Sequence, residues 1–160
     1  MAESRTAFKL HEPLQRAVED YLRTAHKLCE EATRALAQRG LPEAAVKAWS
    51  AVLHATAALV TAASGRLCSL SDVLHGEPVT SFFTKICPAS AEELGALFRS
   101  VRSGYCDAVY NGWISGDQEQ IVQEAGEYLK RVSELLEPPS ARHRARAANS
   151  NSQGGIYRGD

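Results

Sequence analysis

The chain has 160 residues, of which 44% are hydrophobic and 23% are charged, and its formal net charge is −1. These values are typical of one globular domain. The nearly neutral charge excludes a general electrostatic attraction to nucleic acid or to a membrane surface, so any contact with phosphate has to come from a local patch.

The longest apolar stretch, residues 51–63, is interrupted by His54, Thr56 and Thr61. A bilayer span needs about 20 consecutive apolar residues, so we expect a buried helix here and no contact with a membrane. The N-terminal segment also lacks the apolar core of a signal peptide. The expected location is therefore the cytoplasm.

The four cysteines are spread through the chain without a C-x-x-C pair: Cys29, Cys68, Cys87 and Cys106. Structural zinc sites usually take their ligands from closely spaced pairs. Free thiols are expected in a reducing cytosol, with a disulfide as the alternative in a hyperthermophile. No glycine-rich phosphate loop or metalloprotease motif is present, so we predict neither a metal site nor a cofactor.

Two long helices are predicted in the first half of the chain. Apolar residues recur at steps of three and four from Pro13 to Arg39, and proline suits the first turn of a helix. A second helix is predicted from Pro42 to Ser64, ended by Gly65. Alanine fills nine of its 23 positions. Small side chains on several faces predict a central helix that neighbours touch on more than one side.

The second half is predicted to hold two short helical segments and two long helices. The short segments lie within residues 66–89. Ser90 opens an S-A-E-E capping box in which Glu93 reaches back, and the third long helix extends from there to about Gly112. The fourth starts after a cap at Ser115 or Asp117 and runs to about Leu136, where prolines stop it.

The predicted fold is therefore all-α, an up-and-down bundle of four long helices with a short helical insertion. Residues 1–12 form an N-terminal extension, residues 13–137 the bundle, and residues 138–160 a disordered tail poor in apolar side chains. The tail contains Arg142, Arg144 and Arg146. These arginines either keep the tail soluble or make weak contacts with RNA or DNA phosphate.

Two patterns resemble the HEPN superfamily, and within it the archaeal PaREP-type proteins. The first is Y-L-x-x-A at Tyr21, followed by K-A-W-x-A at residues 47–51. The second is the pair of aromatic sites at Leu97-Phe98 and Val109-Tyr110. The resemblance covers about residues 14–136. It implies a helical bundle that is commonly a homodimer, either a toxin ribonuclease or the partner of a small nucleotidyltransferase.

HEPN ribonucleases use an R-x(4–6)-H motif, in which arginine binds the phosphate and histidine moves the proton. Here the arginine is Arg102, but Cys106 stands four residues later where the resemblance implies a histidine. A thiol is a poor proton donor or acceptor for this reaction unless its pKa is shifted. Nuclease activity is therefore in doubt.

The candidate catalytic residues are Arg102, Cys106, Tyr110 and His54, none of them with an assigned role. Arg102, Cys106 and Tyr110 follow each other at helical spacing and form one ridge. Residues expected to bind RNA or a partner are Arg102, Asp107, Asn111, Arg142, Arg144 and Arg146. The alternative interpretations are structural. The ridge would then be the edge of the buried face of the helix, and His54 would be a packed core residue.

We expect a dimeric HEPN-like binding module for RNA or a nucleotidyltransferase-type partner, without strong catalysis of its own. A divergent, metal-independent endoribonuclease is the first alternative, with Arg102 on the phosphate and a substitute base such as His54 or Tyr110. A purely structural interaction bundle is the second. Whether the chain is an enzyme stays open at this point.

Overall fold

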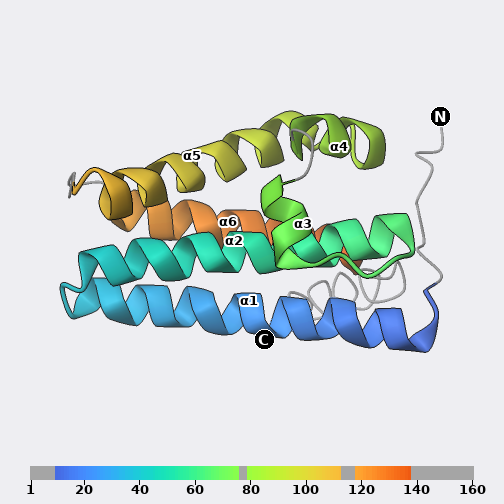
Figure 1. The fold of residues 1–160 in the computed structure, drawn as a ribbon, viewed down its shortest axis with the longest axis horizontal. Helices are drawn as coiled ribbons and strands as arrows, with labels where there is room; N and C mark the ends of the chain where they lie inside the picture. Colours follow the sequence, from blue (N-terminus) through green and yellow to red (C-terminus); the bar gives the residue numbers. More distant parts are fainter. Residues whose placement is uncertain (1–9, 76–78, 113–117, 138–160) are drawn as a thin grey trace, which may run out of the picture.

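The structure, a computed structural model, describes residues 10–75, 79–112 and 118–137. These ranges hold six helices and no strand (Figure 1). The predicted all-α bundle with four long helices and a short insertion is confirmed. In chain order the helices are α1 (Glu12–Ala37), α2 (Leu41–Ser64), α3 (Leu70–His75), α4 (Val79–Ile86), α5 (Ala91–Tyr110) and α6 (Gln118–Leu136).

The helices begin and end close to the proline and glycine residues that predicted their boundaries. Proline lies in the first turn of α1 and of α2, where a missing N–H costs nothing. Gly65 ends α2 with a φ of 67°, in the left-handed region that glycine adopts without strain. The caps predicted for the fourth helix, the tail and most of the N-terminal extension lie outside the described residues.

The capping box predicted at the start of α5 does not form. Ser90 occupies the cap position, but its side chain makes no capping hydrogen bond, and its backbone (φ −112°, ψ 0°) is not the extended conformation that such a cap needs. Glu93 instead pairs with Arg131 of α6 at 3.0 Å. The Glu93 carboxylate, which the capping box required, therefore binds Arg131 of the neighbouring helix instead.

Helix α2 is the centre of the bundle, as its alanines predicted. It packs against α1, α5 and α6, and α3 lies against its C-terminal half (Figure 1). Eight of its nine alanines are buried: Ala44, Ala45, Ala48, Ala51, Ala55, Ala57, Ala58 and Ala62. Small side chains let the backbones of three neighbours approach at once.

By length and apolar composition alone, α2 is also long enough to cross a membrane, which the interrupted apolar stretch did not predict. Within its most apolar window, however, 72% is buried by the rest of the bundle. The core helix of a globular protein passes the same test, so this composition is explained by packing.

A series of aromatic rings runs through the core. The ring of Phe83 lies 6.3 Å from that of Tyr128, which lies 6.3 Å from Phe98, and Phe98 lies 5.1 Å from Trp49. Trp49 is only 5% exposed, so it belongs to the core. Edge-on and tilted pairs of this kind add to the stability gained from burial alone.

The fully buried Tyr128 finds its hydrogen-bond partner on α2. Its hydroxyl lies 2.6 Å from Thr56 Oγ1, and Thr56 donates its own proton to the carbonyl of Val52 at 2.7 Å. Because a threonine hydroxyl has one proton, Tyr128 is the donor in this pair. Burial raises the pKa of Tyr128 well above its ordinary value, so the donor proton is retained.

Gly104 of α5 marks a close approach to α6. A Cβ at this position would collide with Cδ1 of Ile121 and would lie 2.7 Å from Cγ1. Ile121 is itself buried in the core. The absence of a side chain at Gly104 therefore sets how closely α5 and α6 pack.

We expect Thr56→Val to destabilise the fold more than Tyr128→Phe. The valine leaves a buried tyrosine hydroxyl without an acceptor, which costs about 1–3 kcal/mol, whereas the phenylalanine removes one hydrogen bond at about 1 kcal/mol. Urea unfolding of both variants and of the double variant measures the difference. Equal losses in the two single variants would contradict the donor assignment.

Gly104→Ala should destabilise the protein by about 1–3 kcal/mol through overpacking against Ile121. The matched control is Gly126→Ala on α6, where an added Cβ meets nothing within 4 Å. The free energy of unfolding of this control should rise by about 0.5–1 kcal/mol, because alanine has the higher helix propensity. Ile121→Val removes Cδ1, so the Gly104→Ala penalty measured in that background should shrink. An unchanged penalty would refute the contact.

Candidate functional site

Helix α2 directs side chains toward α5 on one side and toward α1 on the other. The Trp49 ring packs on α5, with its centroid 6.1 Å from that of Tyr105. The His54 ring packs on α1, 6.0 Å from Tyr21. Helices α1 and α5 are not among the described pairs that pack extensively on each other. The gap between them is filled by α2 itself.

On α2, some side chains point between the direction of α5 and the direction of α1. Along the N-terminal half of the helix these side chains are accessible to solvent. At about 100° per residue, Val46 and Ser50 lie between Trp49 and His54 around the helix axis. Val46 is 38% exposed and Ser50 is half-buried. Farther along α2, α3 and the segment before it provide cover, and the N–H of Cys68 donates to Thr61 (Figure 1). We call Val46, Ser50 and the helix flanks beside them the open face.

The α5 flank of the open face carries most of the residues predicted from the sequence. Arg102 is exposed, Cys106 is half-buried, and Tyr110 is 74% exposed. Arg99, three residues before Arg102, is exposed on the same side of the helix and was not recognised in the sequence. We call these four residues the α5 ridge. The structure thus brings Arg102, Cys106 and Tyr110 together as predicted.

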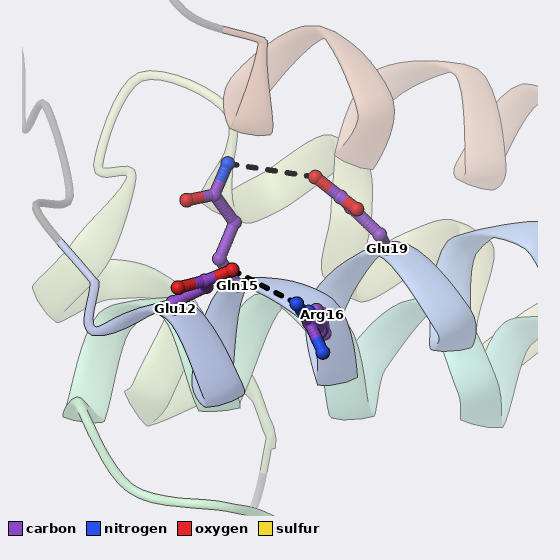
Figure 2. A network of polar contacts seen from close by, with 4 residues as sticks. All are labelled: Glu12, Gln15, Arg16 and Glu19. Atoms are coloured by element: carbon purple, nitrogen blue, oxygen red, sulfur yellow. Dashed lines mark hydrogen bonds and ion pairs between the residues drawn. The ribbon is translucent and has the colours of Figure 1, made fainter.

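The two arginines of the α5 ridge have no ion-pair partner among the described residues. Other exposed arginines do: Arg16, for example, donates to Glu12 at 2.9 Å on α1. In the same turn of α1, the side-chain amide of Gln15 donates to Glu19 (Figure 2). Unlike this self-paired surface of α1, the α5 ridge presents positive charge that is not neutralised nearby.

Tyr110 is held in place by the ring of Tyr105. Their centroids lie 6.2 Å apart with an interplanar angle of 87°, and Tyr105 in turn stacks on Trp49 at 24°. Partial burial raises the pKa of Tyr105, and the neighbouring Tyr110 raises it further. The phenol of Tyr105 therefore keeps its proton near pH 7, which suits stacking and hydrogen bonding rather than a role as a base.

His54 lies on the α1 flank of the open face. Its Nδ1 atom is 2.7 Å from the backbone carbonyl of Ser50. A carbonyl only accepts, so Nδ1 carries a proton, and Nε2 of the neutral ring is left as an acceptor. The hydroxyl of Tyr21, the ring partner of His54, donates to the carbonyl of Cys68 at 2.6 Å. The environment of His54 is thus the packed, hydrogen-bonded one of a structural histidine.

Lys47 forms a cross-helix ion pair that the sequence did not reveal. Its Nζ lies 2.9 Å from the carboxylate of Glu31 on α1, with both side chains about a third exposed or less. The hydrogen bond to Glu31 raises the pKa of Lys47, and the same bond lowers the pKa of Glu31. This ion pair ties α1 to α2.

Asp107 and Asn111 lie away from the open face. Asp107 is nine residues, or two and a half turns, beyond Phe98, so it projects away from the core, and it lies three residues before Tyr110 of the α5 ridge. Asn111 donates to Asp107 at 3.1 Å, and both are exposed. Both residues therefore lie farther round α5 from Arg102 than Cys106 and Tyr110 do.

The remaining candidates add no chemistry to the open face. Arg142, Arg144 and Arg146 lie outside the described residues. Within the described part of the chain, no three His, Cys, Asp or Glu side chains are grouped as metal ligands. All four cysteines are free thiols. Burial raises the pKa of Cys29 to about 11, and burial also raises the pKa of Cys68 and Cys87.

The raised pKa of Cys29 predicts a loss of stability at alkaline pH. A thiol in the unfolded chain ionises near pH 8.5, whereas the folded thiol keeps its proton up to about pH 11. Its contribution is complete below the unfolded pKa and is lost as pH rises through this window. Cys29→Ala should therefore flatten the fall in the free energy of unfolding there. Leu28→Ala, which removes no titrating group, should lower stability at every pH without flattening the curve.

Comparison with known proteins provides no identification. No family model matches the chain, and neither a curated protein nor a solved structure shows significant similarity to it. The geometry of the open face and the residue patterns are therefore what indicate a function for this protein.

Proposed function

We propose that the protein is a HEPN-like helical binding module that holds RNA through the α5 ridge and does not cut it. The observation that carries the proposal is the pair Arg99 and Arg102, both exposed and without an ion-pair partner among the described residues. Guanidinium groups suit phosphate oxygens because they donate two parallel hydrogen bonds. With a net charge of −1 on the whole chain, this contact is local.

The absence of cutting follows from the residue beside the arginine. Cys106, one turn beyond Arg102, offers a thiol in place of an imidazole. Histidine changes its charge close to physiological pH, whereas an ordinary thiol does not. The arginine can bind a phosphate without a base beside it, but cleavage also needs a group that moves a proton.

One observation favours divergent ribonuclease activity as a second candidate. The Nδ1 hydrogen bond of His54 leaves Nε2 as an acceptor, and His54 and Arg102 lie on the two flanks of the same open face. A base in this position would abstract the proton of a ribose 2′-hydroxyl. The half-buried position of His54 against Tyr21 argues for a structural role instead.

The HEPN resemblance also leads us to propose a homodimer, with a nucleotidyltransferase-type protein as an alternative partner. The exposed apolar residues include Leu67 and Leu74 near α3, at 64% and 52%, which a second chain would cover. Sedimentation of the purified chain decides whether it associates with itself. Association without any binding of RNA would favour the purely structural interaction bundle.

The α5 ridge predicts salt-sensitive binding of a single-stranded RNA of about 12 nucleotides. Fluorescence anisotropy at about 50 mM and about 200 mM salt should show weaker binding at the higher concentration. Arg99→Ala and Arg102→Ala should each lower the salt slope by about 0.7, the value for one phosphate contact on a single strand. Arg16→Ala, on the self-paired surface of α1, should change little.

Electrophoresis of the same RNA, without added metal, tests for cutting. An intact RNA is expected after prolonged incubation. Cleavage that is lost in both His54→Ala and Arg102→Ala would replace the binding proposal with the ribonuclease. Binding that is absent at both salt concentrations would refute the proposal itself.

A further inference from the structure

Resting on the proposed function, we infer that the α5 ridge binds a single-stranded segment of RNA by stacking one base on Tyr110 while Arg99 and Arg102 hold phosphates. The proposed function needs only the two arginines. The inference adds a recognition element, the exposed aromatic ring at the end of the ridge, and with it a preference for unpaired bases.

The ring of Tyr110 is both accessible and fixed. It is 74% exposed, the largest value among the exposed large hydrophobic residues of the described chain. Its edge-to-face contact with Tyr105 anchors it, and Tyr105 stacks on the buried Trp49. A ring held in this way loses little conformational freedom when a base packs on it, so more of the stacking energy remains as affinity.

The spacing along α5 suits a short nucleotide segment. Arg102 and Tyr110 are eight residues apart, which is about 12 Å along a helix. A stacked strand rises about 3.4 Å per nucleotide, so three to four nucleotides span this distance. Arg99 lies one turn farther from Tyr110 and extends the positively charged part of the ridge.

The charges that face this path do not oppose an RNA backbone strongly. Beside the ridge, α2 presents Val46 and Ser50, which carry no charge. Glu43, three residues before Val46, is exposed on the same side of α2. Glu31 of α1 and Glu43 both raise the pKa of Lys47, and Glu31 is ion-paired with it. Asp107, three residues before Tyr110, accepts a hydrogen bond from Asn111 at 3.1 Å and lies farther round α5 from Arg102 than Cys106 and Tyr110 do.

A single strand fits this surface better than a duplex. In a duplex, base faces are covered by their neighbours, and the deep, narrow major groove of A-form RNA keeps side chains from the base edges. A single strand exposes its base faces. Such bases commonly stack on aromatic side chains such as tyrosine, and the phosphates bind positively charged side chains such as arginine.

The test separates stacking from charge by comparing two ligands with the same number of phosphates. One is a single-stranded RNA of about 12 nucleotides, and the other is a strand of the same length without bases. Tyr110→Ala should weaken binding of the RNA by about 5- to 100-fold, the range for loss of one stacked base, and leave the abasic strand unaffected. Tyr110→Phe keeps the ring and should bind the RNA like the wild type.

Arg102→Ala should weaken binding of both ligands equally, because both have phosphates. An RNA hairpin with a fully paired stem should bind no better than the abasic strand. Gln15→Ala is the control for loss of an exposed side chain elsewhere, on the self-paired surface of α1, and should leave every affinity unchanged. Thermal unfolding of each variant verifies that the bundle is intact.

The outcomes distinguish the two levels of the proposal. Equal loss of affinity for the RNA and the abasic strand in Tyr110→Ala, or no loss for either, would overturn the stacking inference while RNA binding stands. Tighter binding of the paired stem would also overturn it. A wild-type protein that binds neither ligand refutes the proposed function. A change of sedimentation in Tyr110→Ala without any effect on RNA would assign the ring to self-association instead.

Discussion

The whole bundle depends on the close approach that the alanines of α2 permit. A helix buried on three sides has to accommodate neighbours whose backbones lie near its own, and large side chains on every face would force them apart. Most α2 positions that face α1 and α6 are therefore small, and eight of its alanines are buried. Trp49 is the large exception, and its ring packs against Phe98 and Tyr105, which fixes where α5 lies.

The open face is a consequence of this arrangement. Because α2 packs on both α1 and α5, it holds those two helices apart, and nothing described covers α2 between them along its N-terminal half. Along the C-terminal half α3 fills the same gap, and the bond from Cys68 to Thr61 fastens the segment before it. The short helical insertion thus decides which half of α2 remains accessible, and with it which part of α5 flanks an open surface.

The sequence predicted the helices well and their mutual contacts only in part. Apolar periodicity, the prolines at helix starts and Gly65 are local signals, so α1 and α2 were located to within about two residues. The Glu93–Arg131 and Lys47–Glu31 pairs join different helices and leave no trace in local spacing. This is why a capping box was predicted for Glu93 and neither pair was foreseen. Arg99 lies outside the R-x(4–6)-H spacing, so that motif did not indicate it.

The small positive charge that this protein offers limits how strongly it can bind RNA through phosphates alone. Two arginines neutralise about two phosphates, and the counterion release from so few contacts yields a weak, strongly salt-dependent interaction. Proteins that rely on charge alone carry a positive excess, whereas this chain has a net charge of −1. Useful affinity at physiological salt therefore requires a contribution that salt does not screen, and burial of a base against an aromatic ring is one. The fixed ring of Tyr110 at the end of the α5 ridge is the feature of the described surface that supplies it, so arginines and ring are best understood as parts of one binding surface.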